Sequence, residues 1–196
     1  ALGVAAREEV VELDLLLPGA ADDMAGLWSS QRRADEAQAL HARLAAVAPP
    51  GFEVVELRVL EPGERRASAL IAGAAYTLSL GPALASSVAA ALPERLAGPL
   101  TIERAAKPTK RRGPPAPCTI IDVRPRVLSA KVDVAAGLLH FALDMRATAE
   151  EGGTGGGGAR PRDVVAALCG MPLPDHLLCR DELLAVRDGA FVRLRS

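Results

Sequence analysis

The residues with the clearest chemical potential form a run of positive charge near the middle of the chain. Between Arg104 and Ile121 there are five basic residues and no acidic one, although the whole chain has a net charge of −1. Clustered cations neutralise phosphates, and each contact adds about 0.7 to the salt slope on a single strand. The candidate nucleic-acid ligands are Arg104, Lys107, Lys110, Arg111, Arg112 and Arg124.

The prolines within this run support a different interpretation equally well. Pro108, Pro114, Pro115 and Pro117 hold the segment extended and solvated, so its cations are presented without a fold of their own. The same composition describes a linker that binds nothing, and a basic segment can also dock on an acidic protein surface. All three interpretations stay open at this point.

Two shorter motifs could bind an anion. Asp122 and Arg124 lie two residues apart, so we expect them on one face of a strand. We favour an ion pair that orders this strand over a bidentate grip of Arg124 on a phosphate. Arg160 and Pro161 open a predicted helix, whose free N–H groups can hold an anion, although proline at this position is also an ordinary helix start.

Other patterns argue against a catalytic or metal site. Residues 153–158 satisfy G-x-G-x-x-G, but the ribose-binding acid and the P-loop lysine are missing, which indicates a flexible insertion. Cys118, Cys169 and Cys179 are odd in number and form no C-x-x-C pair, so we expect reduced, mostly buried thiols and no metal. His140 and Asp144 should both point outward on one strand, about 13 Å apart.

Composition indicates a globular protein without a membrane segment. Hydrophobic residues make up 49% and charged residues 24% of the 196 residues. The sequence has no apolar run of about 20 residues and no signal-peptide pattern at its N-terminus. We therefore expect a cytoplasmic protein, or one of an organelle matrix if the source is eukaryotic.

The elements that must position these residues alternate between strand and helix. Alternating patterns predict strands over 8–19, 52–63 and 76–80, with short strands at 100–104 and on both sides of Asp188-Gly189. Residues 118–128 look extended, and 129–145 read as a hairpin that turns near Ala136-Gly137. Helices are predicted over 24–49, 66–71, 83–99 and 160–170.

The strands are amphipathic, which indicates one solvated sheet face. We therefore predict an α+β fold, with a mostly antiparallel sheet, helices on one face and ferredoxin-like βαβ elements. We expect a first unit over 1–104, a basic proline-rich linker or loop over 105–117 and a second unit over 118–196, or else one continuous domain.

Four segments of the chain follow one another in a recognisable order: "LGVAAREEVVELDL", "APPGFEVVELRVLEPGERRASALIAGAAYTL", "IERAAKPTKRRGPPAPCTIIDVRPRVL" and "GGARPRDVVAALCG". In this order they resemble the radical-SAM-linked protein family, a domain of unknown function. The family's preceding R-F-x-x-H-x-D-x-x-R and S-x-G-F-N-P-H-P portion is absent, so we expect a fragment or processed piece. Residues 24–38 and 150–158 are longer than the family pattern.

The resemblance implies an accessory role beside a radical SAM enzyme, separate or fused upstream. The C-x-x-x-C-x-x-C motif is absent from this chain, so S-adenosylmethionine and an iron–sulfur cluster are implied for the partner only. We expect a non-catalytic domain that presents an RNA, tRNA or rRNA, for modification. The alternative is a protein-interaction module that docks or stabilises the partner without nucleic acid.

Overall fold

The computed structural model of the chain contains two compact units. Residues 1–9 and 71–194 form the first unit, and residues 10–70 with 195–196 form the second. The structure describes residues 5–7, 9–12, 29–61, 63–105, 118–146, 160–174 and 177–194.

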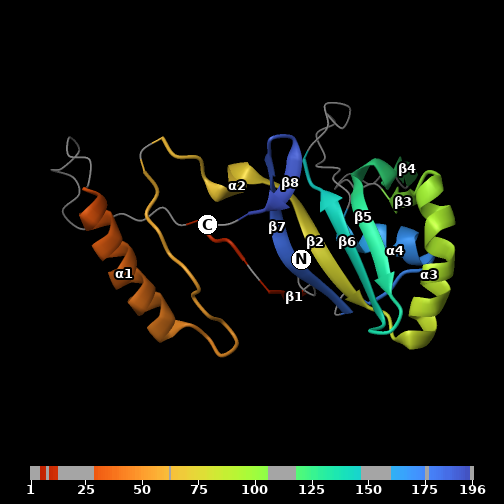
Figure 1. Ribbon diagram of the computed structural model, residues 1–196, viewed down its shortest axis with the longest axis horizontal. Coiled ribbons are helices and arrows are strands. Elements are labelled where there is room, and N and C mark those ends of the chain that lie inside the picture. Colours follow the sequence, from red (N-terminus) through yellow and green to blue (C-terminus); the bar gives the residue numbers. More distant parts are fainter. Residues whose placement is uncertain are drawn as a thin grey trace, which may run out of the picture. The chain divides into compact units, whose positions relative to one another are not determined.

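A mostly antiparallel sheet forms the centre of the first unit (Figure 1). Its strand order is β1-β7-β2-β6-β5, and β8 pairs with β7 as well. Only the pairing of β1 with β7 is parallel among the described strands of this sheet. The strands are β1 (Ala5–Ala6), β2 (Ile71–Ser79), β5 (Val127–Asp133), β6 (Leu138–Asp144), β7 (Leu178–Arg187) and β8 (Ala190–Arg193).

Two helices connect these strands in a βαββαβ arrangement. Helix α3 (Pro82–Ala97) follows β2, and helix α4 (Pro161–Cys169) lies between β6 and β7. The chain order β2-α3-β5-β6-α4-β7 and the sheet order β7-β2-β6-β5 are those of a ferredoxin-like fold. The predicted α+β class with an antiparallel sheet is therefore confirmed.

A separate hairpin is inserted between α3 and β5. Strands β3 (Thr101–Ala105) and β4 (Cys118–Asp122) pair with each other, and the short 3-10 helix η1 (Arg124–Arg126) leads into β5. Residues 106–117, the greater part of the predicted linker, lie outside the described residues. Residues on both sides of that predicted boundary, 71–105 and 118–194, share the first unit.

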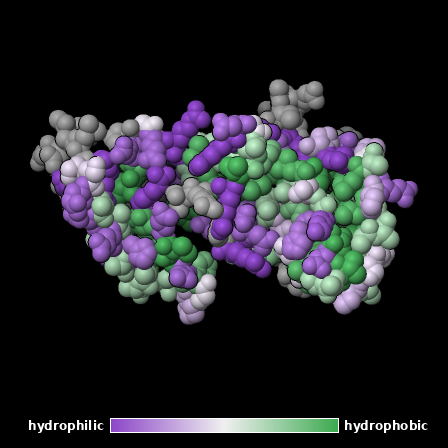
Figure 2. Space-filling view, in the orientation of Figure 1, coloured by the Kyte–Doolittle hydropathy of each residue, from purple (hydrophilic) through white to green (hydrophobic). Residues whose placement is uncertain are grey.

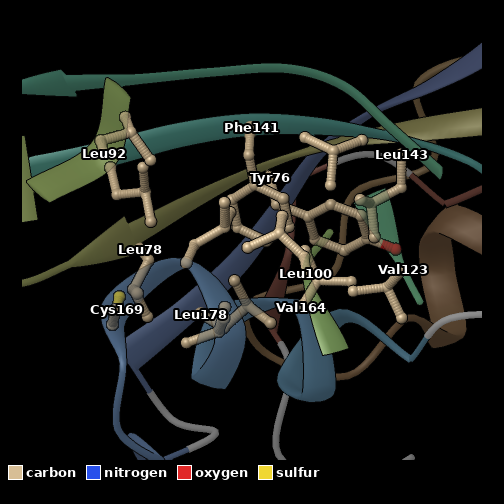
Figure 3. Close-up of a cluster of buried hydrophobic side chains, with 14 of the residues drawn as sticks. Tyr76, Leu78, Leu92, Leu100, Val123, Phe141, Leu143, Val164, Cys169 and Leu178 are labelled. Carbon is tan, nitrogen blue, oxygen red and sulfur yellow. The ribbon is translucent and has the colours of Figure 1, made fainter. Parts of the chain in front are cut away.

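Both helices pack on the same side of the sheet and enclose the core there. Tyr76 of β2 and Phe141 of β6 stack with their ring centroids 5.2 Å apart (Figure 3). Alternate residues of the strands point into this layer because side chains of a strand alternate between its faces. The largest fully buried side chains are Leu78, Val88, Val123, Leu139, Leu143, Val164, Leu168 and Leu178.

The predicted helix between Pro161 and Gly170 is confirmed, and the half-buried Arg95 contacts its end. Gly170 adopts the left-handed conformation that closes helices (φ 72°). Arg95 of α3 donates from one guanidinium nitrogen to the carbonyl oxygen of Leu168, at 2.6 Å. A Cβ at Gly170 would lie 2.5 Å from Arg95 Nη2, so glycine also leaves room for this contact.

The second unit contains helix α1 (Ser30–Val47) and the one-turn helix α2 (Ala67–Leu70). The Ser29 hydroxyl caps α1 by accepting from the backbone N–H of Arg32 at 3.2 Å. Among the described residues of this unit, only Ala37 is buried. No described helix of the chain is long and apolar enough to cross a bilayer.

The structure corrects two predicted strands in this unit. Residues 52–61 contain no strand, and neither do residues 9–12, while the rest of the predicted strand 8–19 lies outside the described residues. The alternating pattern of 52–63 was a valid strand signal, but a strand also needs a hydrogen-bonded neighbour. His41, expected on the surface, is half-buried and hydrogen-bonds the carbonyl oxygen of Val54 at 2.8 Å.

Candidate ligand-binding face of the sheet

The sheet of the first unit has a second face, opposite the face that α3 and α4 cover. The residues that alternate with the core residues emerge there, and several are polar or charged. We call this surface the open face. It is formed by Gly73, Ala75 and Thr77 of β2, Ser129 and Lys131 of β5, His140, Ala142 and Asp144 of β6, and Cys179, Asp181 and Glu182 of β7.

A hydrogen-bonded network crosses the centre of the open face. The Thr77 hydroxyl donates to Asp181 Oδ2 at 2.5 Å and lies 2.9 Å from His140 Nδ1. Because that hydroxyl has one proton, which Asp181 accepts, His140 Nδ1 must carry a hydrogen and donate to Thr77. In a neutral ring, Nε2 then keeps its lone pair as an acceptor on an exposed side chain.

Asp181 lies at a β-bulge. The pairing of β2 with β7 changes from Ala75–Glu182 to Tyr76–Arg180, so Asp181 is the extra residue of the bulged strand. Its other oxygen, Oδ1, lies 3.3 Å from Nε of Arg7. Asp181 thus shares the outward direction of Cys179, which lies opposite Thr77, and the bulge then turns Leu183 toward the core.

Cations flank this network on both sides. Lys131 of β5 lies directly opposite His140, which in turn lies opposite Thr77. Directly opposed residues share a face, so Lys131, His140 and Thr77 form one line across three strands. Arg7 extends the polar line beyond Asp181. Such a line offers hydrogen-bond partners at its centre and positive charge at its ends.

A second ordered group lies at the other end of β6, about four residues from His140. Asp144 accepts from Arg146 at Oδ1 (Nε, 2.9 Å) and at Oδ2 (Nη2, 2.7 Å). The same guanidinium lies over the ring of Phe191 from β8, with 4.9 Å between Cζ and the ring centroid. These hydrogen bonds from Arg146 lower the pKa of Asp144, so the pair is charged at neutral pH.

The predicted motif around Asp122 and Arg124 has a structural role here. Asp122 Oδ1 accepts from the backbone N–H groups of Leu100 and Arg124, each at 2.9 Å. Arg124 donates from Nε to Leu96 O at 2.8 Å and from Nη1 to Val127 O at 3.2 Å. Its guanidinium thus joins the end of α3 to the start of β5.

The expected shared strand face of Asp122 and Arg124 is wrong. Strand β4 ends at Asp122, and Val123 has helical backbone angles (φ −94°, ψ −2°), so Arg124 begins η1 instead of continuing the strand. The pattern predicted an extended chain, but the Asp122 carboxylate holds the N–H group two residues ahead and favours a turn.

The remaining predicted ligands are placed only in part. Arg160 is exposed at the N-cap of α4 and Pro161 is its first residue; Asp163 already occupies the first turn. The backbone of Arg104 lies in β3, opposite Thr119. The predicted ligands Lys107, Lys110, Arg111 and Arg112 and the glycine tract 153–158 lie outside the described residues, and their binding stays a prediction.

The thiols differ in exposure, and the expected burial holds for only part of them. Cys169 is buried, and burial raises the pKa of its thiol to about 11. Cys179 is half-buried, and Cys118 is exposed. The described residues contain no group of three histidine, cysteine or acidic side chains that could hold a metal ion.

The second unit has a hollow of its own between α1 and residues 55–64, with a volume of about 1080 Å³. Ion pairs lie at its rim, Arg33 with Glu61 at 2.7 Å and Arg58 with Glu64 at 2.6 Å. Hydrophobic residues also reach the surface of this unit (Figure 2). Among them, Phe52 is 74% exposed and Val55 82% exposed.

Residues 1–154 match the family described as "Uncharacterized protein conserved in bacteria (DUF2344)". The chain belongs to this family. The match includes Thr77, His140 and Arg146, whereas α4, β7 and β8 follow it in sequence. No curated protein and no solved structure matches the chain.

Sequence reasoning missed most of the open face. It placed His140 and Asp144 outward, and both lie on the open face, where His140 is exposed and Asp144 half-buried. Thr77 carried a usable signal, because a threonine between Tyr76 and Leu78 occupies the outward position of an apolar strand. Asp181 carried none, since its contact with Thr77 depends on the pairing of β2 with β7.

Proposed function

We propose that this DUF2344 chain is a non-catalytic accessory domain that binds single-stranded RNA on the open face and presents it to a radical SAM enzyme. The observation that supports this most directly is the line of Lys131, His140 and Thr77 across strands β5, β6 and β2 of a ferredoxin-like sheet. Four-stranded sheets of this kind bind unpaired RNA by stacking bases on rings and contacting the backbone with cations.

The residues of the line suit that task. The imidazole of His140 is a flat ring held in one orientation by Thr77, and its exposed Nε2 can accept from a base. Lys131 supplies charge for a phosphate on one side of it, and Arg7 lies on the other side, where Asp181 offsets part of its charge. Ala75 and Ala142 are small, so a base can approach the strands closely between the polar groups.

The radical SAM partner is supported by the sequence resemblance. A partner that carries its own iron–sulfur cluster and S-adenosylmethionine needs from this chain only a surface that holds the RNA. The open face is rigid because its side chains project from paired strands, and rigid elements position a substrate better than loops do. The basic residues of segment 106–117 would make further, weaker contacts with phosphates of the RNA.

A salt-dependent RNA titration tests the binding. The affinity of a short single-stranded RNA is measured by fluorescence anisotropy at 50 and 200 mM salt. Lys131→Ala should lower the salt slope by about 0.7 per lost phosphate contact, and His140→Ala should weaken binding about 5- to 150-fold. Arg43→Ala removes one charge from exposed α1 and is the matched control.

The outcome separates the open face from the basic segment. If the open-face variants behave like Arg43→Ala while Lys110→Ala/Arg111→Ala/Arg112→Ala abolishes binding, RNA is held by the basic segment and the open-face site is wrong. Wild-type protein that binds no RNA at either salt concentration refutes the function itself.

The exposed apolar residues of the second unit favour a second function, docking of a protein partner. Phe52 and Val55 together present an apolar area that water disfavours, and partner binding would cover it. Complex formation with the radical SAM enzyme that survives 500 mM salt and nuclease, and that Phe52→Ser/Val55→Ser abolishes, would establish docking without RNA. A complex lost on nuclease treatment would rule it out.

A further inference from the structure

We propose that Arg146 is a stacking platform for an RNA base at the end of β6, an inference that rests on the proposed RNA-binding function. The guanidinium group is flat, and bases stack on such planes in single-strand recognition. Three neighbours hold Arg146 in place before any ligand arrives, and one of its two flat sides remains available.

The first neighbour, Asp144, fixes the edge of the guanidinium. Its carboxylate accepts from Nε at 2.9 Å and from Nη2 at 2.7 Å, the parallel two-bond geometry that orients arginine most strictly. It also accepts the backbone N–H of Arg146 at 2.9 Å, so the side chain and its own backbone are anchored to one group. Few rotamers of Arg146 remain to be lost on binding.

The second neighbour, Phe191, supports one flat side of the guanidinium. Arginine over an aromatic ring at this distance is a favourable cation–π contact. Phe191 can lie against the sheet because residue 73 is glycine: a Cβ there would be 3.2 Å from Phe191 Cε1 and 2.5 Å from the carbonyl oxygen of Leu143. Because Gly73 has no side chain, the Phe191 ring has room to pack against the sheet and support Arg146.

The third neighbour, Arg126, fixes the backbone. Arg126 is buried with 6% of its surface exposed, and it donates to the carbonyl oxygen of Arg146. This contact holds residue 146 just beyond the end of β6, where the chain would otherwise be free to leave the sheet. Described residues therefore hold the main chain of Arg146, the Nε–Nη2 edge of its guanidinium group and the flat side of that group that faces Phe191.

The outer side of the guanidinium is open, since the side chain is 53% exposed. Asp144 already occupies the Nε–Nη2 edge and balances the positive charge, so Arg146 is a poor bidentate phosphate ligand. The exposed flat side of its guanidinium group remains available for a base to stack on. His140 and Asp144, the carboxylate that holds Arg146, are four residues apart on β6, roughly 13 Å along the strand, so one strand of RNA can contact both His140 and Arg146.

The test compares two RNA ligands of equal length and charge. One is an octamer of uridine, and the other is an octamer of abasic ribose phosphates, which keeps the backbone and lacks every base. Affinities for both are measured by anisotropy for the wild type, Arg146→Lys and Phe191→Leu. The control Arg43→Lys makes the same exchange on the exposed surface of α1.

Arg146→Lys keeps the charge and removes the plane. We expect the ratio of uridine to abasic affinity to fall about 5- to 150-fold, while the abasic affinity stays within twofold of the wild type. Phe191→Leu should lower the ratio less, because Asp144 still holds the guanidinium. Arg43→Lys should leave both affinities unchanged.

Three results would overturn the inference in different ways. If Arg146→Lys preserves the wild-type ratio, Arg146 is no platform, although RNA binding stands. If Arg146→Lys weakens both ligands equally, the guanidinium contacts the RNA backbone and no base stacks on it. If the wild type binds neither octamer, the proposed function fails together with the inference. Far-UV circular dichroism of each variant checks that the fold is retained.

Discussion

Replacing Gly73 with alanine tests whether Phe191 and the sheet are packed as tightly as the structure shows. The new Cβ would lie 2.5 Å from the backbone oxygen of Leu143, and 3.2 and 3.3 Å from two ring carbons of Phe191. The ring can tilt away, but the backbone oxygen belongs to the β2–β6 ladder and cannot move without loss of strand pairing. Gly73 does not have a positive φ, so the effect is steric and not conformational.

Overpacking of this kind costs about 1 to 3 kcal/mol of unfolding free energy. With a urea m-value of about 2 kcal/mol/M, the unfolding midpoint of Gly73→Ala should fall by roughly 0.5 to 1.5 M. The assay is urea unfolding followed by far-UV circular dichroism and by the fluorescence of Tyr76, which is buried in the first unit.

Gly98→Ala is the matched control for this experiment. It makes the same chemical change at a glycine with an ordinary φ of −119° and with no atom within 4 Å of the added Cβ. Its midpoint should stay near the wild-type value or rise slightly, because alanine restricts the unfolded chain. Equal midpoints for Gly73→Ala and Gly98→Ala would refute the close packing of Phe191 that supports Arg146.

Two further predictions concern ionisable groups of the first unit. Arg146 lowers the pKa of Asp144 in the folded protein below the ordinary aspartate pKa of about 3.9. The ionised Asp144 therefore contributes stability that is fully present above the ordinary pKa. This stability is lost as the pH falls through the lower pKa of the folded state. In urea unfolding at pH 7, Asp144→Asn should be about 1 kcal/mol less stable than the wild type. Below the pKa of Asp144 in the folded protein, the two should be equally stable. A stability difference that does not change with pH would contradict the pairing. Thiol labelling at pH 8 should modify exposed Cys118 within minutes and leave Cys169, whose pKa is about 11, unreacted until the protein unfolds; equal rates would contradict the burial of Cys169.

The parts of the fold that the sequence predicts well are those with local signals. The β5–β6 hairpin turns where Gly137 permits a positive φ of 67°, and α4 lies between a proline and a left-handed glycine. Each of these signals acts within a few residues, so it is legible without knowledge of the rest of the chain.

The parts that the sequence could not predict depend on distant partners. Thr77 and Asp181 are 104 residues apart and meet only because β2 pairs with a bulged β7. Residues 52–63 have the alternation of a strand, yet alternation describes side chains and does not supply a neighbouring strand. Both cases turn on the pairing of strands, which is a property of the whole sheet.

The arginines of the first unit show why counting basic residues overstates anion binding. Arg95, Arg124 and Arg126 each donate to backbone carbonyl oxygens, so their charges are committed to closing helix ends and fixing turns. If one of these arginines were replaced, the carbonyl oxygen would lose a charge-assisted hydrogen bond. We therefore expect such a substitution to lower the stability of the fold more than the affinity for RNA.

Lys131 and Arg146 differ from them because they remain exposed, and Arg146 is held by a carboxylate and a ring instead of by carbonyls. Removing the exposed cation Lys131 gives the fold little reason to change, whereas removing Arg146 also breaks its pair with the half-buried Asp144 and lowers stability. A ligand that needs Lys131 therefore weakens at constant stability. That combination, unchanged unfolding and reduced RNA affinity, is what separates the open face from the arginines that build the fold.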